Sequence, residues 1–147
     1  MRPLLAVIVA LLAACGGPEG GPYELPASEA EQYVTAYIAA VVPDAGADDL
    51  QAGAGEHVVI RNNWDHRTDM GGWYIEDAAG DRLPLGIGRQ IEPQAELRVH
   101  TGCGEDSEEA VYACLDEEVL DDDGDELTLR DSAGGEVARF AYGTAAS

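Results

Sequence analysis

The side chains of this chain that are best suited to chemistry are the carboxylates crowded into its C-terminal half. Twelve of the twenty-two residues from Glu105 to Glu126 are acidic, and none of the twenty-two is basic. Hard cations such as calcium prefer oxygen ligands of this kind. A calcium site is therefore one hypothesis, although a solvated acidic rim is the interpretation that we favour. The candidate ligands, in the densest part of the stretch, are Asp121, Asp122, Asp123 and Asp125.

Three histidines could act as metal ligands or as general bases. Strand alternation puts His57 and His100 on outward faces, whereas His66 falls in a loop. Nothing in their spacing requires them to converge, so we expect no zinc site. We expect His100 instead to hydrogen-bond the turn that follows it.

The sequence contains none of the local patterns that mark the common catalytic sites. It has no G-x-S-x-G elbow, no H-E-x-x-H helix, no P-loop and no deaminase motif. It also has no lysine, which removes Schiff-base chemistry from consideration. We therefore predict a protein that is not an enzyme and needs no cofactor, with calcium as the one candidate ion.

The charge balance restricts the partners that the chain can bind. Its 147 residues include 29 acids against 8 basic residues, all of them arginine, for a formal net charge of -21. A field this negative repels phosphate backbones, so we expect no nucleic-acid partner. The length suits one domain with a core of its own.

The N-terminal residues are typical of an export signal. A single arginine precedes the apolar run Leu4 to Leu12, which is too short to cross a bilayer. The segment that ends this run, LAACG at 12–16, resembles the lipobox of bacterial lipoproteins. In that motif cleavage precedes the cysteine, and the cysteine sulfur receives a diacylglycerol. The resemblance implies a lipidated Cys15 that anchors the protein in the cell envelope, at the outer membrane or surface of a two-membrane bacterium.

This interpretation divides the chain into three parts. Residues 1–14 are the lipoprotein signal peptide, residues 15–27 are the lipidated cysteine and a flexible tether rich in Gly and Pro, and residues 28–147 are the folded domain. With Cys15 lipidated, Cys103 and Cys114 remain, and an oxidising compartment favours a disulfide between them. This bond would close a short loop and contribute about 3 kcal/mol on the chain-entropy account.

The stretch from Glu56 to Gly80 predicts two strands around a central tryptophan. Val58 and Ile60 alternate with Val59 and Arg61, and a polar run then turns the chain. After a glycine pair, Trp73 begins a second alternating segment, and a large aromatic side chain at such a place packs in the core of a small sandwich. Further short alternating segments separated by turn residues continue to Tyr142. We therefore predict an all-β sandwich or barrel.

The segment 28–42 fits two kinds of secondary structure. A capping box followed by Tyr33 and Tyr37 at helical spacing favours a helix. The alternation that includes Ile38 and Val42 favours a strand. Because an all-β domain needs a first strand here, we predict a strand over the second half of the segment.

Five segments of the chain resemble motifs of the lamin tail domain family, in the order of that family. They are the strand Glu56–Asn62, the DMGGW turn Asp69–Trp73, the HTGCG segment His100–Gly104, the DDDGD hairpin Asp121–Asp125 and the closing turn Asp131–Val137. The resemblance covers roughly residues 36–142 and implies an immunoglobulin-like β-sandwich. Leu120 replaces an aromatic residue of the family pattern, and aspartates replace its paired asparagines. Both departures weaken any nucleic-acid role that relatives would imply.

The expected function is that of a non-catalytic, membrane-anchored interaction or structural module at the cell surface, with an envelope protein as its partner. Because Trp73 is better explained as core, Trp64 is the one loop aromatic residue that could face a ligand. Two alternatives stay open: an extracellular calcium-binding module that uses the acidic 116–126 hairpin, and an accessory to a secreted nuclease. The negative charge disfavours the second.

Overall fold

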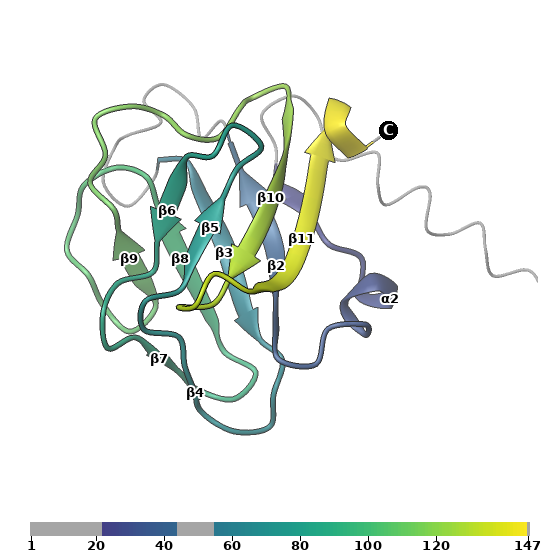
Figure 1. The fold of residues 1–147 in the computed structure, drawn as a ribbon, viewed down its shortest axis with the longest axis vertical. Coiled ribbons are helices and arrows are strands. Elements are labelled where there is room, and N and C mark those ends of the chain that lie inside the picture. The colour runs from purple at the N-terminus through teal and green to yellow at the C-terminus, as the bar shows by residue number, and fades with distance from the viewer. Residues whose placement is uncertain (1–21, 44–54, 147) are drawn as a thin grey trace, which may run out of the picture.

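The computed structural model of this chain describes residues 22–43 and 55–146. The predicted signal peptide, Cys15 and most of the predicted tether lie outside these residues, so the proposed division of the N-terminus stays a prediction. Within the described ranges, no helix has the length and apolar character needed to cross a membrane. Strands are the main regular secondary structure of these ranges, which contain almost no helix (Figure 1).

Two sheets packed face to face make up the domain (Figure 1). The first sheet has the order β1-β2-β3-β8-β9, and its strands are β1 (Tyr23–Glu24), β2 (Ala36–Val42), β3 (His57–Asn62), β8 (Glu96–His100) and β9 (Ala110–Tyr112). The second has the order β11-β10-β5-β6, with β5 (Tyr74–Glu76), β6 (Arg82–Pro84), β10 (Gly124–Arg130) and β11 (Glu136–Gly143). Neighbouring strands are antiparallel except β8 and β9, which are parallel.

Short elements complete the described fold. The two-residue strands β4 (Thr68–Asp69) and β7 (Gln90–Ile91) pair at one end of the sandwich. A single helical turn, α2 (Ala27–Ala30), precedes β2, and the 3-10 turn η2 (Thr144–Ala146) follows β11. The ends of the sandwich are therefore built from loops, while its faces are built from strands.

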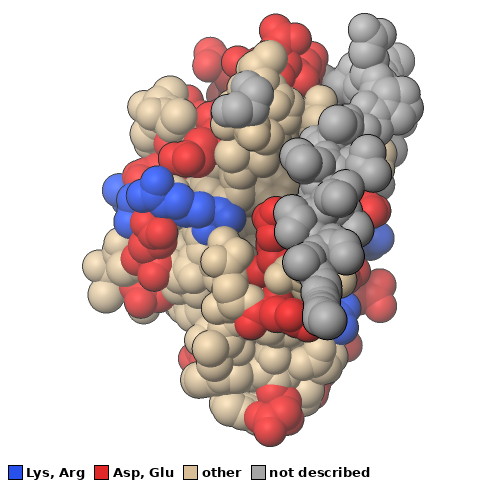
Figure 2. All heavy atoms as spheres, turned by 90° about the vertical axis from the view of Figure 1, so that its right-hand side faces the viewer, with Lys and Arg blue, Asp and Glu red and all other residues tan. Residues whose placement is uncertain are grey.

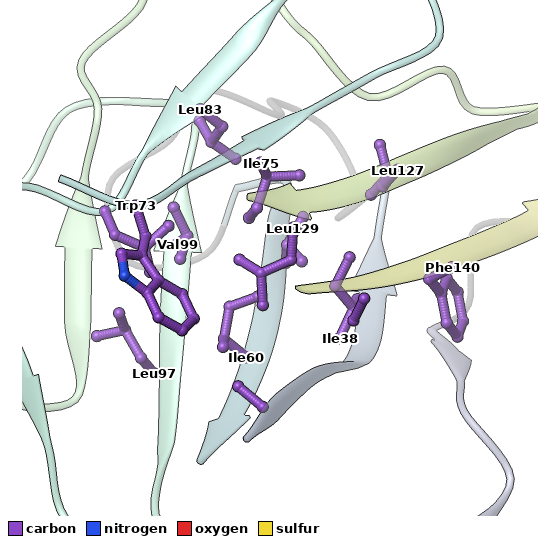
Figure 3. Packing of buried hydrophobic residues seen from close by; sticks show 14 of the residues in the cluster. Ile38, Ile60, Trp73, Ile75, Leu83, Leu97, Val99, Leu127, Leu129 and Phe140 are labelled. Atoms are coloured by element: carbon purple, nitrogen blue, oxygen red, sulfur yellow. The ribbon is translucent and has the colours of Figure 1, made fainter. Parts of the chain in front are cut away.

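The core lies between the two sheets and confirms the alternation seen in the sequence. In β3 the buried side chains are Val58, Ile60 and Asn62, and the positions between them are half-buried. Figure 3 shows the Trp73 ring among core side chains from both sheets. Trp73 is 9% exposed, as expected for the central aromatic of a sandwich. The predicted all-β, immunoglobulin-like sandwich is confirmed.

The ambiguous segment 28–42 contains both predicted kinds of structure, one after the other. Its helical signal produces only the single turn α2, and the second half is strand β2, as we predicted. Strand β2 pairs with β3 and has a register shift between Ile38 and Ala40. This bulge explains why the apolar residues of β2 follow no strict alternation. Pairing with β3 and burial of Ile38 and Val41 outweigh the local helical preference.

Candidate functional site

The loop that follows β3 is organised by the side chain of Asn62. Asn62 is fully buried at the end of its strand. Its Oδ1 accepts hydrogen bonds from the Trp64 N–H at 3.0 Å and from the Thr68 hydroxyl at 3.2 Å. Its Nδ2 donates to the carbonyls of His66, Ile91 and Glu92 at 3.0, 2.9 and 3.2 Å. One amide group therefore bonds backbone groups of two segments, the loop 64–68 and residues 91–92, and fixes the course of the loop.

Trp64 is held near the surface by this loop. Its side chain is half-buried, and its ring lies against that of His66, with the ring centroids 4.2 Å apart. From the other side, the Gln94 amide donates to the carbonyls of Asn63 and Trp64 at 3.0 and 3.2 Å. Arg61 in turn donates to the Gln94 Oε1 at 3.2 Å. An aromatic ring on a backbone braced from two sides is suited to bind a partner with little loss of conformational entropy.

The predicted disulfide joins Cys103 to Cys114 and closes the connection between β8 and β9. Three backbone hydrogen bonds hold the second cysteine's segment against the end of β8: Ala113 to His100, Cys114 to Gly102 and Leu115 to Thr101. Both cysteines are exposed, so the bond lies at the surface. Its role is to join the two ends of an acidic loop.

The four candidate aspartates lie at the end of the sandwich opposite Asn62, where β10 begins. Asp121 Oδ1 accepts the Asp123 N–H at 2.9 Å. Asp125 Oδ1 accepts the Glu126 N–H at 2.8 Å and the Ala78 N–H at 3.3 Å. These carboxylates thus bond backbone N–H groups in different turns.

The acidic hairpin offers a cation no assembled ligand set. Among the described residues there is no group of three or more His, Cys, Asp or Glu side chains that could hold a metal ion. Asp121 and Asp125 instead use one carboxylate oxygen each to bond backbone N–H groups. The calcium hypothesis stays a prediction that the arrangement of these carboxylates does not support.

His100 does not behave as the sequence led us to expect. It lies on the outer side of the first sheet, yet it is only 2% exposed. Neither of its ring nitrogens has a hydrogen-bond partner among the described residues, so it does not bond the following turn. Burial lowers its pKa to about 4, and the charges of His57 and Arg98 act in the same direction. His100 is therefore neutral in the folded protein. The rings of His57 and Tyr112 pack against it, so that neither water nor the following turn reaches its ring nitrogens.

Glu56 is a buried acidic residue that we did not predict as a site residue from the sequence. It is fully buried, and its Oε1 accepts the N–H groups of Val119 and Leu120 at 2.7 and 3.3 Å. Desolvation raises the pKa of this carboxyl, although these N–H groups favour its charged form. The signal was present in the sequence, since Glu56 occupies the same core-facing alternation as Val58 and Ile60. We assign it a structural role, because it bonds the segment that leads into the acidic hairpin.

Turn residues of the predicted motifs also serve the fold. Asp69 Oδ1 accepts the Gly71 N–H at 2.9 Å, and Gly72 has a φ of 81° that suits glycine. Asp131 Oδ1 accepts the N–H groups of Ala133 and Gly135 at 3.0 and 2.8 Å and so closes the turn between β10 and β11. The aspartates and glycines of these motifs therefore form and stabilise turns.

Two facing sheets of short, mainly antiparallel strands, with loops gathered at their ends, define a protein of the immunoglobulin-like class. The family model of the lamin tail domain matches residues 29–144. The chain belongs to the lamin tail domain family, whose members are generally non-catalytic and often serve as structural or interaction modules. No curated protein matches the chain at a significant level.

Proposed function

We propose that this protein is a non-catalytic interaction module that is anchored to the cell envelope by a lipid and binds another envelope protein. The family supports the part of this proposal that concerns an interaction or structural module. The lipobox-like segment around Cys15 supports the anchor. The Gly- and Pro-rich residues that follow would lift the domain from the membrane.

The observation that carries the proposal is the braced Trp64 loop. Its backbone is fixed by Asn62 on one side and by Gln94 on the other. Tryptophan is enriched at the energetic centres of protein interfaces because its ring removes a large area from water. The Trp64–His66 ring pair thus forms the centre of the proposed contact surface.

The charge of the molecule defines the kind of partner. With a formal net charge of -21, the protein attracts a basic surface and repels other acidic ones. The same charge opposes a role as accessory to a nuclease, because DNA would be repelled. We therefore propose an envelope protein with a basic surface near the membrane.

The test is a cross-linked pull-down of the lipidated protein from its own membranes. We expect the wild-type chain to capture a specific protein. The Trp64→Ala variant should capture much less of that protein. Ile87→Ala is the matched control, since Ile87 is a fully exposed apolar side chain on the loop between β6 and β7. Equal recovery with Trp64→Ala and wild type, or no specific capture at all, would count against the proposal.

A further inference from the structure

We propose that the groove between strands β1 and β11 binds a short, extended, basic segment of a partner protein, which pairs with the free edge of β11. β1 is the edge strand of the first sheet, and β11 is the edge strand of the second. The two edges meet on one side of the sandwich, on the face drawn in Figure 2. The groove contains none of the Trp64 loop, so this inference stands apart from the function proposed above.

The groove has an apolar floor. It encloses about 230 Å³, below the ~300–1,000 Å³ of small-molecule sites, and so has room for an amino-acid side chain. The rings of Tyr23 and Tyr142 meet in it with their centroids 5.1 Å apart. Leu25, Pro26 and Phe140 add further apolar surface. An apolar side chain of a docked strand would bury itself there.

The edge of β11 offers backbone hydrogen bonds to a docked strand. The Arg139 carbonyl accepts the Tyr33 hydroxyl at 3.0 Å, which shows that the backbone groups of Arg139 point away from β10. In an antiparallel strand alternate residues point to the same edge, so the N–H and C=O of Ala141 also point away from β10. No described backbone group outside β10 bonds to Ala141. This is the arrangement that strand addition uses.

Strand β1, the opposite wall of the groove, also has backbone groups that point away from its own sheet. The Leu25 N–H donates to the Ala39 carbonyl at 2.9 Å, so the backbone of Leu25 points toward β2. The backbone of Glu24, one residue earlier, therefore points the other way. An extended segment between Glu24 and Ala141 would find hydrogen-bonding groups on both sides.

The charges around the groove select a basic segment. Arg139 lines it, but its guanidinium is paired with Glu136 at 3.0 Å and with Glu126 at 3.2 Å. Glu24 and Glu29 also line it, and among the described residues they have no ion-pair partner. Figure 2 shows both acidic and arginine side chains around the exposed tan surface of this face. Arginine or lysine side chains of the segment would complement the two free carboxylates.

The probe is a blocked peptide of about ten residues that alternates arginine and valine, the pattern of an extended strand with one basic and one apolar face. Binding to the full chain in a mild detergent is followed by fluorescence anisotropy and by amide chemical shifts. We expect the shifts to centre on Glu24 and on Arg139 to Tyr142. A glutamate–valine peptide should bind at least about tenfold more weakly.

Charge variants test whether Glu24 and Glu29 of the groove cause the preference for a basic peptide. Glu24→Gln with Glu29→Gln should weaken binding of the arginine–valine peptide about fivefold at low salt. The matched control is Glu105→Gln with Glu108→Gln, which removes two exposed acids before β9, at the far edge of the first sheet. The control should change affinity less than about twofold.

A second pair of peptides tests backbone pairing and does not depend on the folding of any variant. Each isomer carries N-methyl groups on alternate residues and so lacks the N–H donors of one edge. Strand addition predicts that at least one isomer binds about tenfold more weakly than the unmethylated arginine–valine peptide. Affinities of both isomers equal to that of the unmethylated peptide would overturn the proposal. So would shifts centred on the acidic hairpin, an equal loss in the control variant, or no binding of the arginine–valine peptide.

Discussion

The imidazole of His100 stacks on the ring of Tyr112, with the ring centroids 4.5 Å apart and the planes 10° apart. The His57 ring lies on the neighbouring strand, 4.7 Å from that of His100. Gly104 packs against Tyr112 so closely that a Cβ at this position would come within 2.5 Å of the ring. The disulfide-closed loop is thereby held against the first sheet by a row of rings.

This stack should make the stability of the protein depend on pH. Burial lowers the pKa of His100 to about 4 from its ordinary 6.5, so the folded state holds the ring neutral. As the pH falls from 6.5 toward 4, the unfolded chain binds a proton that the folded chain does not. The free energy of unfolding should therefore fall in this window, by at most about 3 kcal/mol. Burial also lowers the pKa of His57, which contributes with the same sign.

His100→Phe separates this effect from other titrations. Phenylalanine keeps an aromatic ring against Tyr112 and cannot bind a proton. The raised pKa of Glu56 acts in the opposite direction, since a protonated buried carboxyl stabilises the fold as the pH falls. Urea unfolding of both proteins at several pH values should show a flatter profile for His100→Phe. Identical profiles would show that His100 does not titrate as we infer.

Asn62→Ala should be strongly destabilising. The substitution removes the acceptor of the Trp64 N–H and the donor to the buried Ile91 carbonyl. Buried polar groups left without partners cost about 1–3 kcal/mol each, so we expect a loss of about 2–4 kcal/mol in urea unfolding. Gln94→Ala is the control, because Gln94 braces the same loop from an exposed position. A loss no larger than that of the control would mean that Asn62 is not the centre of the loop.

Glu56 should be needed for its hydrogen bonds more than for its charge. Glu56→Ala leaves the N–H groups of Val119 and Leu120 without their acceptor, and we expect a loss of about 2–4 kcal/mol. Glu56→Gln keeps an acceptor oxygen and removes a buried charge, so its cost near neutral pH should stay below about 1 kcal/mol. Denaturant unfolding measures both. Equal losses in the two variants would assign the effect to the charge.

Calcium should raise the melting temperature no more than an equal concentration of magnesium does, in high background salt. The Asp121 and Asp125 carboxylates bond backbone N–H groups in separate turns and do not form a ligand set. A ligand that binds only the folded state must raise the melting temperature. A calcium-specific rise that Asp121→Asn with Asp123→Asn removes would restore the calcium hypothesis.

Local patterns in the sequence were sufficient for the class of fold. Alternation at Val58 and Ile60, and the tryptophan after a glycine pair, report burial directly, because a strand with one buried face repeats every two residues. Turn motifs such as Asp131 to Gly135 form hydrogen bonds between residues close in sequence, so they too can be recognised without the tertiary structure. The disulfide could be predicted by counting cysteines, because Cys103 and Cys114 are the pair that remains in an oxidising compartment once Cys15 is assigned to the lipid.

Other features were decided only by contacts between distant segments. The pattern of 28–42 fits helix and strand alike, and pairing with β3 selected a strand for its second half. His100 was predicted to bond the next turn, but the His57 and Tyr112 rings, brought to it by β3 and β9, bury it instead. The groove at β1 and β11 has no sequence signal, since its walls are more than a hundred residues apart. A single strand's pattern shows which face is buried, whereas the group that covers that face is set by the packing of the whole chain.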